Sequence, residues 1–297
     1  MIKNILVIRN DRFGEFLLNI PAIRALKELY SQSKLTLAVN LAVSELAGAV
    51  ECVDEVVVWD AQFRKSLRAK KFDLGVVLNP TKEAHWAVFW SGIPVRVGYN
   101  RKWGFLLTHR LNDTKYLGDK HEVDCNLDLV GLIGAKTLDK TLKINVDDKL
   151  FQEFIGQRIV AIHPFTSDPV KQWPVERFKE LARRIKAELG LKVVIVGLSQ
   201  SVLDAGDGVV NMVNKTSLLE LAALLKRCAL LVSGDSGPVH LAASVGTPVV
   251  ALFRNDLAAK TARRWGPWGE GHVVIEKGNL LDISVEEVIG AVKLKIK

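Results

Sequence analysis

The sequence predicts an α/β protein built from two doubly wound domains, and three observations lead to this fold class. Short β-branched runs alternate with amphipathic helical stretches along the whole chain. Each predicted strand is a continuous hydrophobic run rather than a polar–apolar alternation, which is typical of a parallel sheet covered on both faces. The 297 residues, 48% of them hydrophobic, suffice for about two domains. Because the pattern restarts after a polar stretch at 137–149, we place the domains at residues 1–150 and 151–297.

The N-terminal half begins with the apolar run 5–8, a buried strand, followed by a helix at 15–30 whose apolar residues recur at helical spacing. Further β-branched runs predict strands at 35–39, 55–58, 74–78 and 95–97. Helical patterns predict helices at 43–50, 62–70, 82–90 and 122–133.

The C-terminal half repeats this alternation. Its strands are predicted at 159–162, 193–196, 230–232 and 249–252, and its helices at 175–189, 218–227, 238–245 and 285–294. Two successive β-α-β series of similar length indicate two doubly wound domains.

Composition limits the possible classes of function. The net charge of +8 is divided evenly between the two halves, which argues against a basic nucleic-acid arm and favours an anionic substrate or an acidic membrane face. No apolar run approaches the roughly 18–20 residues of a membrane span, and Arg9 interrupts the N-terminus too early for a secretory signal. The three cysteines, Cys52, Cys125 and Cys228, are far apart. We therefore expect reduced thiols, no structural zinc and a cytoplasmic protein.

In doubly wound sheets, ligands bind at the carboxyl ends of the strands. The first loop of this kind spans residues 9–15 and places Glu15 at the start of a helix. One interpretation is a general base that takes a proton from an incoming hydroxyl; the other is a carboxylate that only complements the helix dipole. With a single glycine, Gly14, the loop lacks the dinucleotide-binding pattern.

The second loop, residues 163–174, contains two hydroxyls, a lysine and an indole. Thr166 and Ser167 are suited to hydrogen-bond a phosphate that Lys171 neutralises. The alternative is an ordinary polar loop in which Trp173 packs as a plug.

The third loop, residues 233–240, leads into a helix with Pro238 in its first turn. Asp235 or Ser236 is expected to cap the helix, and Gly237 lets an anion approach the free N–H groups. His240 follows Ser236 by four residues, on the same helical face. A well-capped helix with a core histidine is the other interpretation.

Two further segments are weaker candidates. Arg101, Lys102, Trp103 and His109 are suited to hold an acidic acceptor, or form a solvated loop; residues 263–269 either close over a ligand or form a rigid aromatic turn. The signatures of zinc hydrolases, serine hydrolases and P-loop NTPases do not occur.

Taken together, the three loops resemble glycosyltransferase family 9, the bacterial heptosyltransferases of lipopolysaccharide core assembly. The matching segments, in order, are ILVIR at 5–9, GE at 14–15, PAIRAL at 21–26, KQWPVERF at 171–178 and DSGPVHLAA at 235–243. The last is the most specific. The resemblance implies a GT-B fold, in which an N-terminal acceptor-binding domain and a C-terminal nucleotide-sugar-binding domain face each other across a cleft. It also implies inverting transfer of a heptose or related sugar from an ADP-activated donor, without a divalent metal and with no cofactor besides the donor.

Residue by residue, the resemblance assigns Glu15 to the catalytic base, which is usually an aspartate in this family. It assigns Thr166, Ser167 and Lys171 to the donor phosphates, with Lys171 also catalytic. The nucleotide-diphosphate site falls on Asp235, Ser236, Gly237 and His240.

The implied partners are a nucleotide sugar and an anionic glycolipid or glycan acceptor, with no nucleic acid and a peripheral contact at the cytoplasmic face of the inner membrane. Two other functions are compatible with the sequence: a nucleotide-sugar epimerase of the same fold, and a non-catalytic nucleotide-sugar-binding protein.

Overall fold

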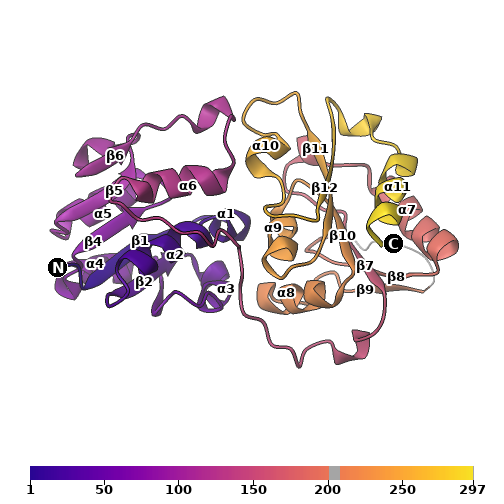
Figure 1. The fold of residues 1–297 in the computed structure, drawn as a ribbon, viewed down its shortest axis with the longest axis horizontal. Helices are drawn as coiled ribbons and strands as arrows, with labels where there is room; N and C mark the ends of the chain where they lie inside the picture. Colours follow the sequence, from indigo (N-terminus) through magenta and orange to yellow (C-terminus); the bar gives the residue numbers. More distant parts are fainter. Residues whose placement is uncertain (201–207, 297) are drawn as a thin grey trace. The chain divides into compact units, whose positions relative to one another are not determined.

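The computed structural model describes residues 1–200 and 208–296 and divides the chain into two compact units, Met1–Asn145 and Val146–Lys297 (Figure 1). The division falls after Asn145, whereas the sequence places the boundary at 150. Among the described residues, no helix has the length and apolar character needed to cross a membrane.

The N-terminal unit is built on a six-stranded sheet with the order β3-β2-β1-β4-β5-β6, and every neighbouring pair is parallel. Ile5 of the central strand is in register with Leu35 on one side and with Leu74 on the other. The strands are β1 (Asn4–Ile8), β2 (Lys34–Val39), β3 (Glu55–Val58), β4 (Leu74–Val77), β5 (Val95–Tyr99) and β6 (His109–Leu111).

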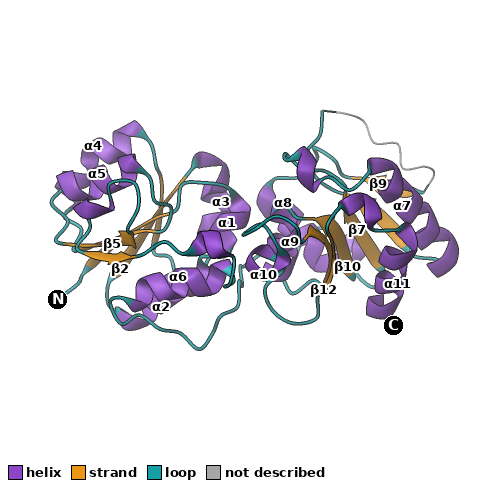
Figure 2. Ribbon diagram, turned by 90° about the horizontal axis from the view of Figure 1, so that it is seen from above, coloured by secondary structure: helices purple, strands orange, loops and turns teal. Residues whose placement is uncertain are grey.

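Helices cover both faces of this sheet, with α4 and α5 on one face and α2 and α6 on the other (Figure 2). The helices are α1 (Phe13–Leu17), α2 (Ile20–Leu29), α3 (Ser44–Gly48), α4 (Ala61–Lys70), α5 (Lys82–Trp90) and α6 (Glu122–Gly131). Short 3-10 turns lie at η1 (Leu41–Val43), η2 (Gly104–Leu106) and η3 (Lys115–Leu117). Buried apolar side chains of α4 and α5, such as Phe63 and Val88, pack on Leu6 and Val77 of the sheet.

The single helix expected at 15–30 is wrong, because the structure forms α1 and α2 with a break at Leu18 and Asn19. Pro21 lies in the first turn of α2. A proline has no N–H to donate and its ring collides with the preceding turn, so a helix that continued through this position would be kinked or broken.

The C-terminal unit repeats the architecture with the order β12-β11-β10-β7-β8-β9, again with parallel neighbours. Its strands are β7 (Ile159–His163), β8 (Lys192–Ile195), β9 (Val209–Asn211), β10 (Leu230–Gly234), β11 (Val249–Arg254) and β12 (Val273–Lys277). Its helices are α7 (Val175–Leu189), α8 (Leu218–Arg227), α9 (Gly237–Ser244), α10 (Ala262–Trp265) and α11 (Val285–Ile296), with 3-10 turns at η4 (Gln152–Phe154), η5 (Pro169–Lys171) and η6 (Leu280–Asp282).

Both sheets reverse their strand order at the centre, between β1 and β4 in the first and between β7 and β10 in the second. Ligands of doubly wound proteins bind outside the carboxyl ends of the strands at such a switch point. The loops after β1, β7 and β10 are the three loops that the sequence singles out. The fold therefore carries all three candidate segments to switch points.

Candidate active site

The second and third candidate loops meet at the switch point of the C-terminal sheet. His163, the last residue of β7, is in register with Ser233 of β10. Beyond these strands, the Lys171 Nζ atom lies 2.5 Å from the Asp235 Oδ2 atom, and the two side chains are only 23% and 11% exposed. The backbones of the two loops also approach each other closely. A Cβ atom added to Gly234 would lie 3.3 Å from the carbonyl oxygen of Lys171. Lys171 and Asp235, more than sixty positions apart in the sequence, thus form an ion pair beyond the carboxyl ends of β7 and β10.

Helix α9 begins at this ion pair, and the side chain of its N-cap residue does not cap it. Ser236 occupies the N-cap position with an extended backbone, but its hydroxyl makes no hydrogen bond to the helix N–H groups. Pro238, in the first turn, has no N–H. The expectation that the Ser236 hydroxyl caps the helix is therefore wrong, although Ser236 does occupy the N-cap position. Without the Ser236 hydroxyl as a cap, backbone N–H groups at the positive end of the helix are suited to bind an anion.

The hydroxyl of Ser236 is instead held by a buried polar cluster. The Ser236 Oγ atom lies 2.9 Å from the Ser233 Oγ atom and 3.2 Å from the His163 Nδ1 atom. The Ser233 Oγ atom is itself 3.1 Å from the same ring nitrogen. Burial lowers the pKa of His163 to about 4, so the imidazole is neutral near pH 7. The cluster orients the start of α9 without adding charge.

A glycine completes the support of His163. Gly197, just after β8, has φ of +127°, and a Cβ atom there would lie 2.7 Å from the His163 ring. Sequence reasoning missed His163, Ser233 and Gly197 as supporting residues. Their signal is positional, because His163 and Ser233 lie at or next to the carboxyl ends of adjacent central strands and Gly197 lies two residues beyond the end of β8.

The remaining candidate residues of the second loop, Thr166, Ser167 and Trp173, differ in burial and in their contacts. The Thr166 hydroxyl accepts a hydrogen bond from the Asp168 N–H at 3.2 Å and so holds the turn that precedes Lys171, whereas Ser167 is exposed. Trp173 is fully buried, edge-on to Phe178 with ring centroids 4.7 Å apart. The indole plug therefore exists, and it anchors the end of the loop that carries Lys171. His240 is buried within α9, at 5% exposure.

In the N-terminal unit, Glu15 lies in α1, after the carboxyl end of β1. Its Oε1 atom pairs with Arg12, and its side chain is 16% exposed while that of Arg12 is 76% exposed. A second carboxylate, Asp11, pairs with the Nε atom of Arg9 at 2.7 Å. Burial raises the pKa of Asp11 above its usual value, against the lowering effect of Arg9. Two carboxylates thus lie at this edge, each with its own arginine.

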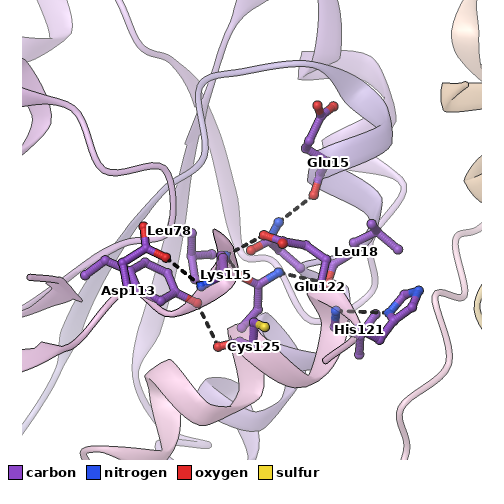
Figure 3. A network of polar contacts seen from close by, with 12 residues as sticks. Glu15, Leu18, Leu78, Asp113, Lys115, His121, Glu122 and Cys125 are labelled. Carbon is purple, nitrogen blue, oxygen red and sulfur yellow. Dashed lines mark hydrogen bonds and ion pairs between the residues drawn. The ribbon is translucent and has the colours of Figure 1, made fainter. Parts of the chain in front are cut away.

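A buried polar network fixes the break between α1 and α2 (Figure 3). Lys115 pairs with Glu122 and lies 3.3 Å from the Asn126 Oδ1 atom, and the Asn126 amide donates to the carbonyl of Leu18 at 3.3 Å. Burial lowers the pKa of Lys115. Asn19 donates to the carbonyl oxygen of Glu15 at 2.5 Å, and Figure 3 shows the Glu15 carboxylate directed away from the network. The network therefore positions the backbone of Glu15 and leaves its side chain outside.

The weaker candidates divide between two segments. Arg101 pairs with Asp113 at 2.7 Å, and Lys102 and Trp103 are exposed beside it, whereas His109 belongs to the edge strand β6. The segment 263–269 begins in the short helix α10, which ends at Trp265. The described residues contain no group of three or more His, Cys, Asp or Glu side chains arranged to hold a metal ion.

Comparison with known proteins places this geometry in a family. The model of glycosyltransferase family 9 (heptosyltransferase) matches residues 61–285. Lipopolysaccharide heptosyltransferase 3 of Escherichia coli (strain K12) is 25% identical over 305 residues, which cover 90% of this chain and 86% of the relative. Among solved structures, a glycosyl transferase of family 9 from Veillonella parvula DSM 2008 superposes with a TM-score of 0.84 at 22% identity, covering 99% of this chain and 97% of the other. The E. coli ADP-heptose lps heptosyltransferase II gives a TM-score of 0.84 at 21% identity, with coverage of 99% and 98%.

These structural neighbours share the two doubly wound domains described above, which is the GT-B fold. The family model spans about three quarters of the chain, from α4 to the start of α11, and includes the Lys171 and Asp235 loops. The chain therefore belongs to glycosyltransferase family 9, the heptosyltransferase family, and is a glycosyltransferase.

Proposed function

We propose that this glycosyltransferase moves a heptose from ADP-heptose to a lipopolysaccharide-core acceptor, with inversion at the anomeric carbon and without a divalent metal. The names of its relatives support the donor and the acceptor: one is a lipopolysaccharide heptosyltransferase and another an ADP-heptose lps heptosyltransferase.

The observation that carries the proposal is the start of α9, which the Ser236 hydroxyl does not cap, beside Lys171. When the bond between the anomeric carbon and the diphosphate breaks, its electron pair leaves with the diphosphate oxygen, where negative charge grows. Backbone N–H groups around Gly237 and the ammonium group of Lys171 are donors of the kind that stabilise such charge. In many phosphate-transfer sites a metal ion supplies this stabilisation. Here we assign it to the helix start and the lysine.

Asp235 has a different part in this proposal. In the free protein it neutralises Lys171 at 2.5 Å. A bound diphosphate competes for the same ammonium group, so the carboxylate holds the lysine in position until the donor arrives. We assign Thr166 and Ser167 to the loop that borders the phosphates, and His240 to the helix that bears their N–H donors.

For the acceptor we propose that Glu15 is the general base. The acceptor hydroxyl oxygen forms its bond to the anomeric carbon on the face opposite the departing diphosphate, and its proton passes to the Glu15 carboxylate. A single displacement of this kind inverts the configuration. The pairing of Glu15 with the exposed Arg12 supports this role, because a surface ion pair is weak enough to rearrange when the hydroxyl binds.

The acceptor of such a reaction is an anionic glycolipid, and the net charge of +8 suits it. We propose that the protein acts on the cytoplasmic side of the inner membrane, in peripheral contact with its surface.

One experiment tests the proposed reaction. Purified protein is incubated with ADP-heptose alone, with acceptor alone and with both, and products are followed by mass spectrometry in the presence and absence of EDTA. Transfer that requires both substrates and survives EDTA is expected. A changed donor sugar in the donor-only sample would instead identify an epimerase, and donor binding with no product on any core acceptor would identify a binding protein.

A further inference from the structure

Helix α5 carries an apolar face that the domain does not cover. Ala84, His85 and Val88 are buried against the sheet. On the outer side, Trp86, Phe89 and Trp90 remain 45%, 41% and 64% exposed. A helix that is apolar all round is normally enclosed on all sides. The exposed aromatic side chains on the outer face of α5 therefore indicate a binding partner outside the domain.

The exposed rings form one cluster. Trp86 stacks on Trp90 with ring centroids 5.5 Å apart and planes at 15°, and it meets Trp103 edge-on at 5.8 Å and Phe89 at 6.2 Å. Trp103 comes from the loop after β5, where Lys102 and Trp103 both adopt left-handed backbone, with φ of 44° and 45°. Such strained positions in non-glycine residues concentrate at functional sites. We call Trp86, Phe89, Trp90 and Trp103 the aromatic cluster.

Basic side chains border the aromatic cluster. A groove of about 460 Å³ between α4 and α5 is lined by Trp86 and Trp90 together with Arg64, Lys65 and Arg68. On the other side of the cluster, the Lys82 Nζ atom lies 5.7 Å from the centre of the Trp103 ring.

Most of this positive charge is not neutralised within the domain. Lys65, Arg68, Lys82 and Lys102 are exposed, and within the described part of the chain none of them has a carboxylate in ion-pair distance. Glu83 is the acidic group that lines the groove, and it pairs with Arg64 at 2.8 Å. The surface therefore combines indole rings with a local excess of positive charge.

We infer that the aromatic cluster, with Lys65, Arg68, Lys82 and Lys102, docks the N-terminal domain onto an anionic phospholipid bilayer. Tryptophan rings favour the boundary between headgroups and acyl chains, and lysine and arginine are attracted by the negative surface potential of anionic lipids. Soluble monomers rarely expose a contiguous patch of this kind without an interaction that uses it. Charge complementarity selects a bilayer over an uncharged apolar partner.

The position of this surface suits a membrane-embedded acceptor. Trp103 follows the carboxyl end of β5, and the Glu15 loop follows the carboxyl end of β1; in a parallel sheet these ends lie at one edge. Docking by the aromatic cluster brings this edge close to the lipid surface. The inference rests on the peripheral contact proposed above and assigns residues to it.

The test is cosedimentation of the protein with vesicles of phosphatidylcholine alone or of phosphatidylcholine mixed with anionic phosphatidylglycerol. Each basic residue near an anionic surface contributes about 1 kcal/mol. We expect binding to the anionic vesicles only. Neutralising two basic residues in Lys65→Gln/Arg68→Gln should weaken binding about 25-fold, since about 1 kcal/mol corresponds to about fivefold. Trp86→Ser/Trp90→Ser should weaken it at least about tenfold by removing the apolar anchor.

Matched controls change charge and apolar area elsewhere. Lys136→Gln/Lys143→Gln removes the same charge from the same domain, and Leu138→Ser/Leu294→Ser removes exposed apolar side chains outside the surface. Both should bind vesicles like the original protein, and thermal unfolding should show that all four variants are folded.

Equal binding by the surface variants and the controls would overturn the inference, as would failure of the original protein to bind anionic vesicles. Light scattering provides the alternative outcome. If the original protein is a dimer and the Trp86→Ser/Trp90→Ser variant is a monomer, the surface binds a second copy of the chain instead. Because the assay measures lipid binding, its result is independent of whether the proposed sugar transfer is correct. If transfer is found, the surface variants should lose rate on vesicle-embedded acceptor and keep it on deacylated, water-soluble acceptor.

Discussion

Replacing Lys171 by alanine should weaken the binding of ADP far more than the binding of adenosine. In the free protein, the Lys171 ammonium group lies 2.5 Å from the Asp235 carboxylate, beside the start of α9. A charge-assisted hydrogen bond to phosphate is worth about 1.5–3 kcal/mol. The variant also removes the ammonium group that lies beside the Asp235 carboxylate, so this carboxylate should repel the incoming phosphates more strongly. We therefore expect a loss at the upper end of that range, about 100-fold, since about 1.4 kcal/mol is a factor of ten.

A second substitution separates the two contributions. In Lys171→Ala/Asp235→Asn the repulsive carboxylate is gone, so ADP affinity should recover part of the loss. Asp235→Asn alone frees Lys171 from its competitor and should leave ADP binding unchanged or tighter. Calorimetric titration of the original protein and the three variants with ADP and with adenosine measures the dissociation constant of each ligand for each protein.

Two outcomes would refute this reasoning. Equal losses for ADP and adenosine on Lys171→Ala would mean that the diphosphate is bound elsewhere. A double variant that binds ADP more weakly than Lys171→Ala would mean that Asp235 contacts the donor directly and does not oppose it.

Three further predictions concern the base, the supporting histidine and the glycine behind it. Glu15→Gln should lower turnover about 10²-fold or more at nearly unchanged donor affinity, while Glu15→Asp, the residue usual in the family, should remain active. Because the pKa of His163 is about 4 when folded and 6.5 ordinarily, only the unfolded chain takes up the proton between these values. Stability should therefore fall by up to about 3 kcal/mol as pH drops from about 6.5 to 4, and this dependence should be weaker in His163→Gln. Gly197→Ala should destabilise the fold by more than about 2 kcal/mol, because its Cβ atom would lie 2.7 Å from the His163 ring at a left-handed φ.

Each of these has a measurement that contradicts it. Full activity in Glu15→Gln would transfer the role of base to Asp11 or remove it. Urea unfolding at several pH values should give the original protein a steeper acid slope than His163→Gln, and parallel slopes would show that His163 is not the group that titrates. For Gly197→Ala the reference is Gly48→Ala, where a Cβ atom meets nothing within 4 Å, and equal stability of the two variants would contradict the packing argument.

Much of the fold was predictable because its central strands are buried on both faces. Strands such as β1 and β10 are nearly continuous apolar runs, which the sequence displays directly. The missed strands, β6, β9 and β12, lie at sheet edges. β12 alternates between partly buried and exposed residues, and β6 is mostly exposed. Edge strands bury less surface, so their sequence carries less of the apolar signal.

The candidate site was predictable only in part, for a similar reason. Local sequence revealed Lys171 and Asp235 as loop residues, but their pairing depends on β7 and β10 being neighbours, and this follows from the topology. The hydroxyl of Ser236 was expected to cap α9. It bonds instead to the nearby Ser233 and to His163, which lies 73 positions away in the sequence and competes for it with the helix. Competition between local and long-range hydrogen bonds is invisible in a linear sequence.

The separate completion of the two sheets has a consequence for how such enzymes diversify. Every strand finds its neighbours within its own half of the chain, on either side of the junction at 145–146. Changes in the loops of one half can then accumulate without disturbing the packing of the other. If the acceptor and the nucleotide sugar bind to different halves, as we propose, acceptor preference can change while donor binding is retained. A chimaera joined at this junction, with the first half of one relative and the second half of another, is the laboratory equivalent of that history.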